Sequence, residues 1–338
     1  MAGRFAPRSP RPTRTTVRGG EAVVPSEVPR QGPSARVRRW VPPGALDLGL
    51  VLGPLRRGPG DPTFRTTPDG SVWRTARTPA GPGTLRVHAG AGEVVGEAWG
   101  PGAGWLLDTL PELLGAADEP EAFEPRHRVV ALARHRRPGL RLTRTGLVLE
   151  SLIPSVLEQK VTAEEAYRAW RLLVRGFGER APGPAGASAR PLFVMPSPRE
   201  WALIPSWEWH RAGVDDKRAS TILRAVRVAS RLEEGVSLPV SDARARLEVV
   251  PGVGPWTSAE VVQRSHGAVD AVTVGDLHLP GIIGFALAGD RSADDAEMLR
   301  LLAPYAGQRQ RAVRLILLSG VVPGRRAPKM RKVDIGGL

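Results

Sequence analysis

The sequence contains no cysteine, which excludes disulfide bonds, cysteine-ligated zinc sites and cysteine-bound iron–sulfur clusters. It also has no uninterrupted run of about 18 apolar residues, the length that a membrane-spanning helix needs, so we expect no membrane partner. The first residues are rich in Arg and Pro and lack the apolar stretch of a secretory signal. Together these absences predict a cytoplasmic protein.

What the sequence has instead is positive charge, a formal net charge of +14 over 338 residues. Residues 1–40 contain nine arginines and two glutamates, and residues 323–338 contain five Lys or Arg and one Asp. The charge is therefore concentrated towards the two ends. A basic chain is typical of proteins that bind a polyanion such as nucleic acid. Because basic ends can also serve solubility alone, the charge supports such a partner without establishing it.

Hydrophobic residues make up 41% of the sequence, enough for a substantial core, and the patterns divide the chain into four parts. Residues 1–40 lack hydrophobic periodicity and predict a disordered basic arm. Residues 41–120 predict a small α+β domain built on an antiparallel sheet, and residues 121–322 predict an all-α bundle. Residues 323–338 predict a basic tail. The expected fold class is therefore α+β.

In the first of the two folded parts, short apolar or β-branched runs are separated by turns rich in Pro and Gly. Their spacing predicts a meandering antiparallel sheet, followed by a helix over Trp105–Leu114. The expected strands are Leu46–Leu52, Thr63–Thr67, Val72–Ala76 and Leu85–His88.

The second folded part has the periodicity of helices. The longest helical stretch is Leu147–Phe177, which we expect to be interrupted at Pro154. Residues 178–198 are rich in Gly, Pro and Ala and predict a loop. The remaining expected helices are Pro198–Ile204, Ser206–Ala212, Asp215–Glu233, Ser241–Val249, Trp256–Ser265, Leu277–Ala288, Asp294–Ala303 and Gln308–Leu318.

Two of these helices are joined by residues 251–255, which read Pro-Gly-Val-Gly-Pro. We expect Ser241 and Asp242 to cap the first helix, and the two prolines to end it and to begin the second. Gly252 and Gly254 permit the positive φ angles of a tight hairpin. Free backbone amides and the dipole of the second helix would then favour a phosphate oxygen at this point. An ordinary corner between two helices is the alternative.

A lone acid, Asp276, follows the hairpin and begins a predicted helix. The helix dipole at that point stabilises the ionised carboxylate. A carboxylate close to the C1′ atom of a sugar can stabilise the positive charge that develops when a base–sugar bond breaks. The alternative is that Asp276 is only a helix cap, since Asp is a preferred cap residue. Asp270 is a rival acid, and its position in a turn predicts a solvated loop residue.

The hairpin and its flanks resemble a known family. Residues 247–257 (Leu-x-x-x-Pro-Gly-Val-Gly-x-Trp-Thr) resemble the helix-hairpin-helix signature of the base-excision DNA glycosylase superfamily. Residues 274–278 (Val-Gly-Asp-Leu-His) are similar to its Val-Asp-x-His segment with one extra Gly, and residues 152–162 resemble a segment of bacterial 3-methyladenine DNA glycosylase II. The resemblance implies two helical lobes with a cleft between them. It also implies a monomer, associated with the nucleoid, whose partner is double-stranded DNA with a damaged base.

The resemblance further implies that Asp276 is catalytic, in an enzyme that removes alkylated purines of the 3-methyladenine and 7-methylguanine type. Superfamily members that also cut the strand carry a Lys where this chain has Trp256. Base removal alone, leaving an abasic site, is therefore implied here. Trp256, Glu260 and Gln159 are assigned to the base pocket. The residues assigned to DNA contact are Lys160, Gly252, Val253, Gly254, Pro255, Trp256 and Thr257.

No cofactor is required by the resemblance. It does imply a bound Na⁺ or K⁺ ion at the hairpin, on the backbone carbonyls of Glu248, Val250 and Val253.

Some positions depart from the family pattern. Lys160 stands where the family has an apolar residue or Gln that fills the space left by the flipped base. Glu260 stands near an aromatic position of the family, which predicts a more acidic pocket. Arg309 and Arg311 stand in a stretch that lacks the family's later aromatic residues. We expect these two arginines either to contact phosphates or to pair with acids.

Two other functions stay open. The chain could be a non-catalytic helix-hairpin-helix protein that binds damaged or distorted DNA, or a glycosylase specialised for bulky alkyl adducts. Asp276 and Trp256, each in its matched setting, favour the monofunctional enzyme over the first alternative.

Overall fold

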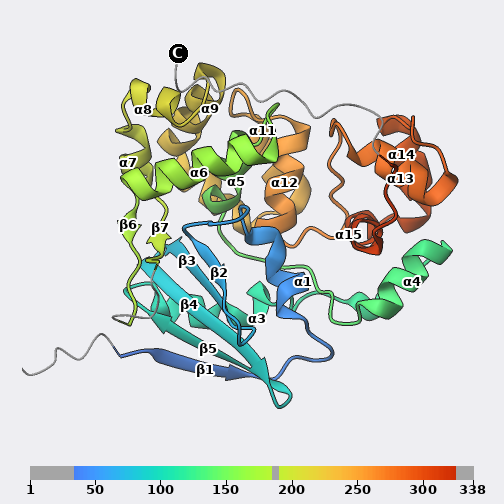
Figure 1. Cartoon of the computed structure of the whole chain (residues 1–338), viewed down its shortest axis with the longest axis horizontal. Helices are drawn as coiled ribbons and strands as arrows, with labels where there is room; N and C mark the ends of the chain where they lie inside the picture. The colour runs from blue at the N-terminus through green and yellow to red at the C-terminus, as the bar shows by residue number, and fades with distance from the viewer. Residues whose placement is uncertain (1–33, 185–189, 325–338) are drawn as a thin grey trace, which may run out of the picture. The chain divides into compact units, whose positions relative to one another are not determined.

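The computed structural model describes residues 34–184 and 190–324, and its element order is shown in Figure 1. The predicted arm lies outside these residues except at its end, and the predicted tail lies outside them except at its beginning. The described part combines one larger antiparallel sheet with many helices, so the α+β class is confirmed. No helix within it is long and apolar enough to cross a membrane.

The sheet has five antiparallel strands in the order β1-β5-β4-β3-β2. Three expected strands are confirmed in place, although β4 is longer than predicted and begins inside an expected turn. The strands are β1 (Arg36–Trp40), β2 (Phe64–Thr66), β3 (Val72–Thr78), β4 (Gly81–Gly90) and β5 (Glu93–Trp99).

Strand β1 corrects the predicted boundary of the disordered arm, because it lies inside residues 1–40. It is an edge strand that pairs only with β5, with Arg36 opposite Ala98, and three of its five residues are exposed. An edge strand needs no alternating apolar residues, and its charged side chains discourage further pairing. The arginines therefore concealed the strand from a search for hydrophobic alternation.

The expected strand Leu46–Leu52 is also wrong, because α1 (Leu48–Leu52) is helical and continues into a 3₁₀ turn over Gly53–Leu55. Asp47 caps α1, since its Oδ1 accepts a hydrogen bond from the backbone N–H of Leu50 at 3.0 Å. A short apolar run is compatible with either a strand or a buried helix. Here the capping aspartate selects the helix.

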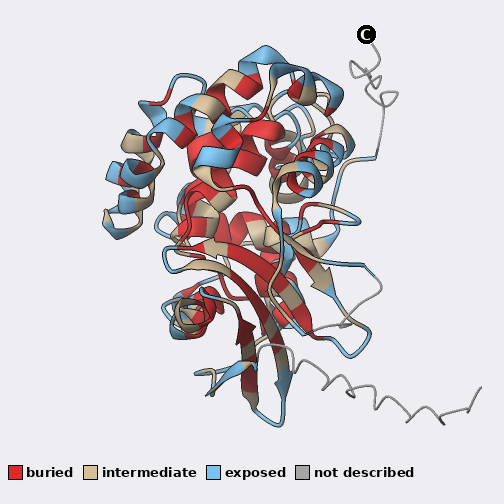
Figure 2. Cartoon of the chain, turned by 90° about the vertical axis from the view of Figure 1, so that its left-hand side faces the viewer, coloured by how far each residue is buried: buried red, intermediate tan, exposed pale blue. Residues whose placement is uncertain are grey.

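The helix expected over Trp105–Leu114 is present as two short helices, α2 (Ala103–Asp108) and α3 (Leu110–Leu113), which pack on the sheet. Leu106 and Leu110 are fully buried with Leu85 of β4 in one apolar core. Figure 2 shows buried residues along the strands and on the helix faces turned towards the interior.

The remaining chain is helical, apart from a two-stranded ladder of β6 (Glu179–Arg180) and β7 (Phe193–Val194) inside the expected loop. Single-turn 3₁₀ segments occur at Pro120–Ala122, Glu234–Ser237 and Ala303–Tyr305. The helices are α4 (Arg128–Arg136), α5 (Leu149–Leu157), α6 (Ala163–Phe177), α7 (Pro198–Ala202), α8 (Ser206–Arg211), α9 (Asp216–Arg227), α10 (Ala229–Glu233), α11 (Val240–Glu248), α12 (Pro255–Ser265), α13 (Leu279–Ala288), α14 (Asp295–Leu302) and α15 (Arg309–Ser319).

The long helical stretch is interrupted at a different place from the one predicted. Pro154 lies inside α5, where burial of eight of the nine residues holds the helix despite the missing N–H. The break falls instead at Lys160, whose φ of 55° is left-handed. Helix α6 then begins with a capping box between Thr162 and Glu165.

The helices form two lobes with separate apolar cores, as expected. One core includes Leu152 and Val261 and draws on α5 to α12, and the other includes Ile283 and Ile316 and draws on α4 and α13 to α15. A buried ion pair between Arg74 of β3 and Glu150 of α5 joins the sheet to the first lobe.

Candidate active site

The hairpin between α11 and α12 is closed by a hydrogen bond from the N–H of Val253 to the carbonyl of Val250 at 2.9 Å. Gly252 has the expected positive φ, 100°, and a Cβ at this position would lie 2.0 Å from Thr221 Oγ1 of α9. Gly254 was expected to have a positive φ as well, but its φ is −113°. Only one of the two glycines is therefore required by backbone conformation.

The ends of the two hairpin helices agree only in part with the sequence. Pro255 is the first residue of α12, as predicted. The expected capping of α11 is wrong, because the helix begins at Val240 and no side chain caps it. Ser241 donates its hydroxyl hydrogen bond to Asp242 instead.

Gln159 ties the turn between α5 and α6 to the hairpin. Its Nε2 donates to the carbonyl of Gly252 at 3.0 Å and to Thr257 Oγ1 at 2.8 Å. The sequence assigned Gln159 to the base pocket, whereas its amide holds the hairpin in place. The exposed Lys160 is the next residue of this turn.

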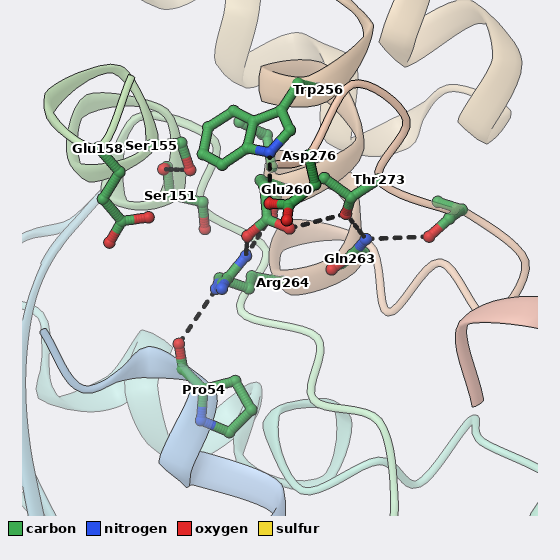
Figure 3. A network of polar contacts seen from close by, with 12 residues as sticks. Pro54, Ser151, Ser155, Glu158, Trp256, Glu260, Gln263, Arg264, Thr273 and Asp276 are labelled. Carbon is green, nitrogen blue, oxygen red and sulfur yellow. Dashed lines mark hydrogen bonds and ion pairs between the residues drawn. The ribbon is translucent and has the colours of Figure 1, made fainter. Parts of the chain in front are cut away.

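Asp276 lies in the loop before α13 and receives three hydrogen bonds, of which Figure 3 shows the one from Trp256. Trp256 Nε1 donates to its Oδ2 at 3.0 Å, and the N–H groups of His278 and Leu279 donate to its Oδ1 at 2.8 and 2.9 Å. The side chain thus caps α13 and also faces the indole of Trp256. The two interpretations of Asp276, cap and reactive carboxylate, are compatible in this geometry.

The same contacts decide the ionisation of Asp276. Burial alone would raise the pKa of this carboxyl, but the hydrogen bonds from Trp256, His278 and Leu279 outweigh it and lower the pKa below its usual value. Asp276 is therefore a carboxylate at neutral pH, which is the form that can stabilise a positive charge.

The rival acid Asp270 is not a solvated loop residue. It forms an ion pair with Arg309, with 2.5 Å between Oδ2 and Nη2, and it also accepts from the backbone N–H of Arg309. Arg311 likewise pairs with Asp118. Both arginines therefore pair with acids, one of the two expected outcomes, and Asp270 is occupied within the fold.

A cavity of about 260 Å³ lies next to Asp276, between residues of α1, α12, α13 and α15. It therefore draws on both helical lobes and on the sheet-bearing part. Its lining residues are Leu50, Val51, Pro54, Arg141, Leu142, Thr143, Glu260, Gln263, Arg264, Thr273, Asp276, His278, Leu279, Ile282, Gln310, Val313, Arg314 and Leu317. Trp256 and Gln159 are not among these described lining residues. A separate cavity of about 500 Å³ between α4 and α15 contains neither Asp276 nor any hairpin residue.

Glu260 does line the cavity, but it does not make it more acidic. Its Oε2 lies 2.7 Å from Arg264 Nη1, and its Oε1 accepts from Thr273 Oγ1 at 2.8 Å. Burial alone would raise the pKa of Glu260, but the Arg264 guanidinium and the Thr273 hydroxyl lower it below its usual range. Arg264 is in turn anchored on the Pro54 carbonyl at 3.1 Å (Figure 3). The charge of Glu260 is thus balanced, and the predicted acidic pocket is wrong.

Arg264, Gln310 and Arg314 are among the polar cavity residues that the sequence interpretation missed. They belong to no local motif, and the Arg264–Pro54 contact joins residues far apart in the chain. Gln310 and Arg314 are one helical turn apart on α15, a spacing that is visible in the sequence, but nothing in the sequence indicates which side of α15 meets Asp276.

Neither a protein-family model nor a curated protein matches this sequence. Solved structures are similar in fold. The 3-methyladenine DNA glycosylase of Archaeoglobus fulgidus superposes with a TM-score of 0.68 at 16% identity, covering 83% of this chain and 98% of its own. MBOgg1 in complex with a low-affinity DNA ligand gives 0.66 at 16% identity, covering 85% and 95%.

The 8-oxoguanine glycosylase/lyase of Clostridium acetobutylicum, in complex with double-stranded DNA, gives a TM-score of 0.66 at 12% identity, covering 86% of this chain and 96% of its own. These identities establish similarity of fold, and the similarity extends over most of each chain. The chain therefore has the fold of the helix-hairpin-helix DNA glycosylases.

Proposed function

We propose that this protein is a monofunctional DNA glycosylase, which hydrolyses the bond between a damaged base and its deoxyribose. The observation that carries the proposal is Asp276, a carboxylate kept ionised by three hydrogen bonds at the edge of a cavity of about 260 Å³. That volume is below the range of roughly 300–1,000 Å³ of pockets for drug-sized ligands. It suits one base extruded from a duplex.

In the proposed reaction the hairpin holds the DNA strand through its backbone amides, at the start of α12. The damaged nucleotide rotates out of the duplex at a cost of a few kcal/mol, which is smaller for damaged pairs. As the bond from C1′ to the base breaks, the sugar acquires oxocarbenium character, and the Asp276 carboxylate stabilises that charge. Water then adds to C1′ and leaves an abasic site.

Trp256 supports the absence of strand cleavage. An indole has no amine with which to form the imine on which a lyase step depends. Trp256 donates a hydrogen bond to Asp276 instead, which keeps the carboxylate ionised.

For the substrate class, the sequence resemblance points to alkylated purines. An electron-rich indole face would attract such cationic bases, but Trp256 contacts Asp276 and does not itself line the cavity. The partner would be double-stranded DNA, bound by a monomer.

We also propose a Na⁺ or K⁺ ion on the carbonyls of Glu248, Val250 and Val253. The Val250 carbonyl accepts from Val253 N–H and retains a second lone pair for an ion. DNA affinity in potassium chloride should exceed that in tetramethylammonium chloride at equal ionic strength. Equal affinities would remove the ion from the proposal.

The experiment that tests the function is incubation of the protein with duplexes that each carry one damaged base, followed by detection of the free base. The expected result is base release with strands that break only after hot alkali, because the abasic site is alkali-labile and the protein does not cut it. Strand breaks at the lesion in the presence of the protein, before any alkali is added, would indicate a lyase. Tight binding of damaged duplexes without release of any base would favour the non-catalytic alternative.

A further inference from the structure

Helix α15 presents two side chains to the cavity with unused hydrogen-bonding capacity. Gln310 is only 6% exposed, and its Oε1 is buried without a hydrogen-bond partner among the described residues. Arg314, one turn later, reaches only the Leu50 carbonyl, at 3.5 Å, and no carboxylate of the described chain pairs with it. Buried polar and charged groups are normally satisfied, so an orphan amide and an unpaired guanidinium in one cavity point to a ligand.

The charges around Arg314 restrict what this ligand can be. Burial lowers the pKa of Arg314 to about 10, with a smaller contribution from the Arg264 guanidinium, so Arg314 stays protonated at neutral pH. The nearby Glu260 is already engaged by Arg264 and Thr273. A cationic ligand would therefore meet an uncompensated positive charge at α15. An anionic ligand would be repelled by the carboxylate of Asp276.

A neutral base with a carbonyl oxygen is repelled neither by Arg314 nor by Asp276, and its carbonyl can accept a hydrogen bond from Arg314. A guanidinium group donates readily to the O6 carbonyl of a 6-oxopurine, and a carboxamide offers both a donor and an acceptor to the same ring. Methylation of guanine at N7 leaves O6 in place but adds a positive charge, which Arg314 repels. The positive charge of Arg314 on α15 therefore disfavours the cationic purines that the face of Trp256 would attract.

We infer that Arg314, assisted by Gln310, selects a neutral 6-oxopurine, produced by deamination or oxidation of a purine, over a cationic alkylated purine. This inference rests on the proposed glycosylase function, and it assigns neutral 6-oxopurines as the substrate in place of the cationic purines that the resemblance implies. The selection has a chemical basis in the leaving group. When the bond from C1′ to N9 breaks, its electron pair stays on the base. A neutral purine then departs as an anion whose charge spreads onto the carbonyl oxygen beside Arg314.

Addition of water and two proton transfers complete the reaction. The sugar cation lies beside Asp276, water adds to C1′ and loses one proton to solvent, and the departing anion takes up one proton from solvent. A cationic purine departs as a neutral molecule, so it needs no positive charge at α15. Loss of Arg314 should therefore slow the release of neutral purines and leave the release of cationic purines unchanged.

The test compares the native protein, Arg314→Met and Arg314→Lys on duplexes that carry hypoxanthine, 8-oxoguanine or 7-methylguanine. Single-turnover release of each base is divided by its spontaneous loss. Removal of one donor to a developing negative charge typically costs on the order of 100-fold. Arg314→Met should lose a factor of that size on whichever of the two oxopurines the native protein releases. Its release of 7-methylguanine should stay within about twofold, and Arg314→Lys should restore part of the oxopurine rate.

Arg300→Met is the matched control, since it removes an exposed guanidinium on α14 that pairs with Glu297. It should change no rate, and thermal unfolding checks that each variant is folded. The two oxopurine duplexes distinguish a deaminated from an oxidised substrate. Release of 7-methylguanine alone by the native protein, or an equal loss on all bases in Arg314→Met, would overturn this inference and leave the proposed function standing. Release of no base at all would overturn both.

Discussion

A single carboxylate and the groups that hydrogen-bond to it are the most informative feature at the scale of residues. Asp276 is partly buried, and burial by itself would favour its neutral form. The indole N–H of Trp256 and two backbone N–H groups at the start of α13 reverse that preference. The sequence identified both Asp276 and Trp256, but the hydrogen bond between them requires the loop geometry, which the motif does not contain.

Replacing Trp256 with Phe should make the reaction more sensitive to acid. The native pKa of Asp276 is below the usual value of about 3.9, so base release should not be limited by this carboxyl until the pH falls below that value. Without the indole donor, burial is less opposed and the pKa rises, so the rate should begin to fall at a higher pH. Single-turnover rates measured between pH 4 and pH 8 test this. A uniform loss of rate with an unshifted profile would show that Trp256 does not set the ionisation of Asp276.

At the scale of elements, the turn between α5 and α6 explains why the predicted interruption was misplaced. Proline is a reliable indicator of a helix break in an exposed helix, but eight of the nine residues of α5 are buried and the helix tolerates Pro154. The real break has no glycine or proline to mark it, because Lys160 itself adopts the left-handed conformation. A residue other than Gly, Asn or Asp in that conformation is uncommon and often occurs at functional sites.

Two substitutions separate the backbone role of Lys160 from its side-chain role. Lys160→Gly should keep or increase the free energy of unfolding, because glycine avoids a left-handed cost of about 1–2 kcal/mol. Lys160→Ala should leave it nearly unchanged. Both should weaken binding to a duplex with an abasic analogue, and the dependence of log affinity on log salt should lose about one phosphate contact. Unchanged affinity in both variants would make Lys160 an ordinary exposed lysine.

For the whole molecule, the decisive feature is that the cavity beside Asp276 draws on separate parts of the chain. Pro54 comes from the sheet-bearing part, Arg264 from the first helical lobe and Arg314 from the second. Local patterns predicted the fold class, most helices and the hairpin, because these depend on periodicity and turn chemistry. They could not predict which side chains meet in the cavity, because that depends on tertiary packing.

The buried ion pair between Arg74 of β3 and Glu150 of α5 should make the free energy of unfolding sensitive to mutation where the sheet contacts the helices. The Arg74 side chain is 3% exposed, and loss of one partner of a buried pair typically costs about 3–5 kcal/mol. Arg74→Met should lower the free energy of unfolding by about that amount. Burial raises the pKa of Glu150 and Arg74 opposes this, so without Arg74 the carboxyl should take up a proton more readily. The destabilisation should therefore shrink as the pH is lowered.

Denaturant unfolding at several pH values measures this effect. The double variant Arg74→Met with Glu150→Gln removes both charges and should recover most of the lost stability. If Arg74→Met is as stable as the native protein at neutral pH, the pair does not hold the two parts together.

Single-turnover base release with Asp276→Asn measures whether Asp276 acts on the sugar of an extruded nucleotide. Asp270→Asn serves as the comparison, because Asp270 is the rival acid and pairs with Arg309, and neither of these residues lines the cavity. Asp276→Asn should retain affinity for a duplex with an abasic analogue and release no base, whereas folded Asp270→Asn should release base at the native rate. Release by Asp276→Asn at the native rate would show that the Asp276 carboxylate does not stabilise the sugar cation.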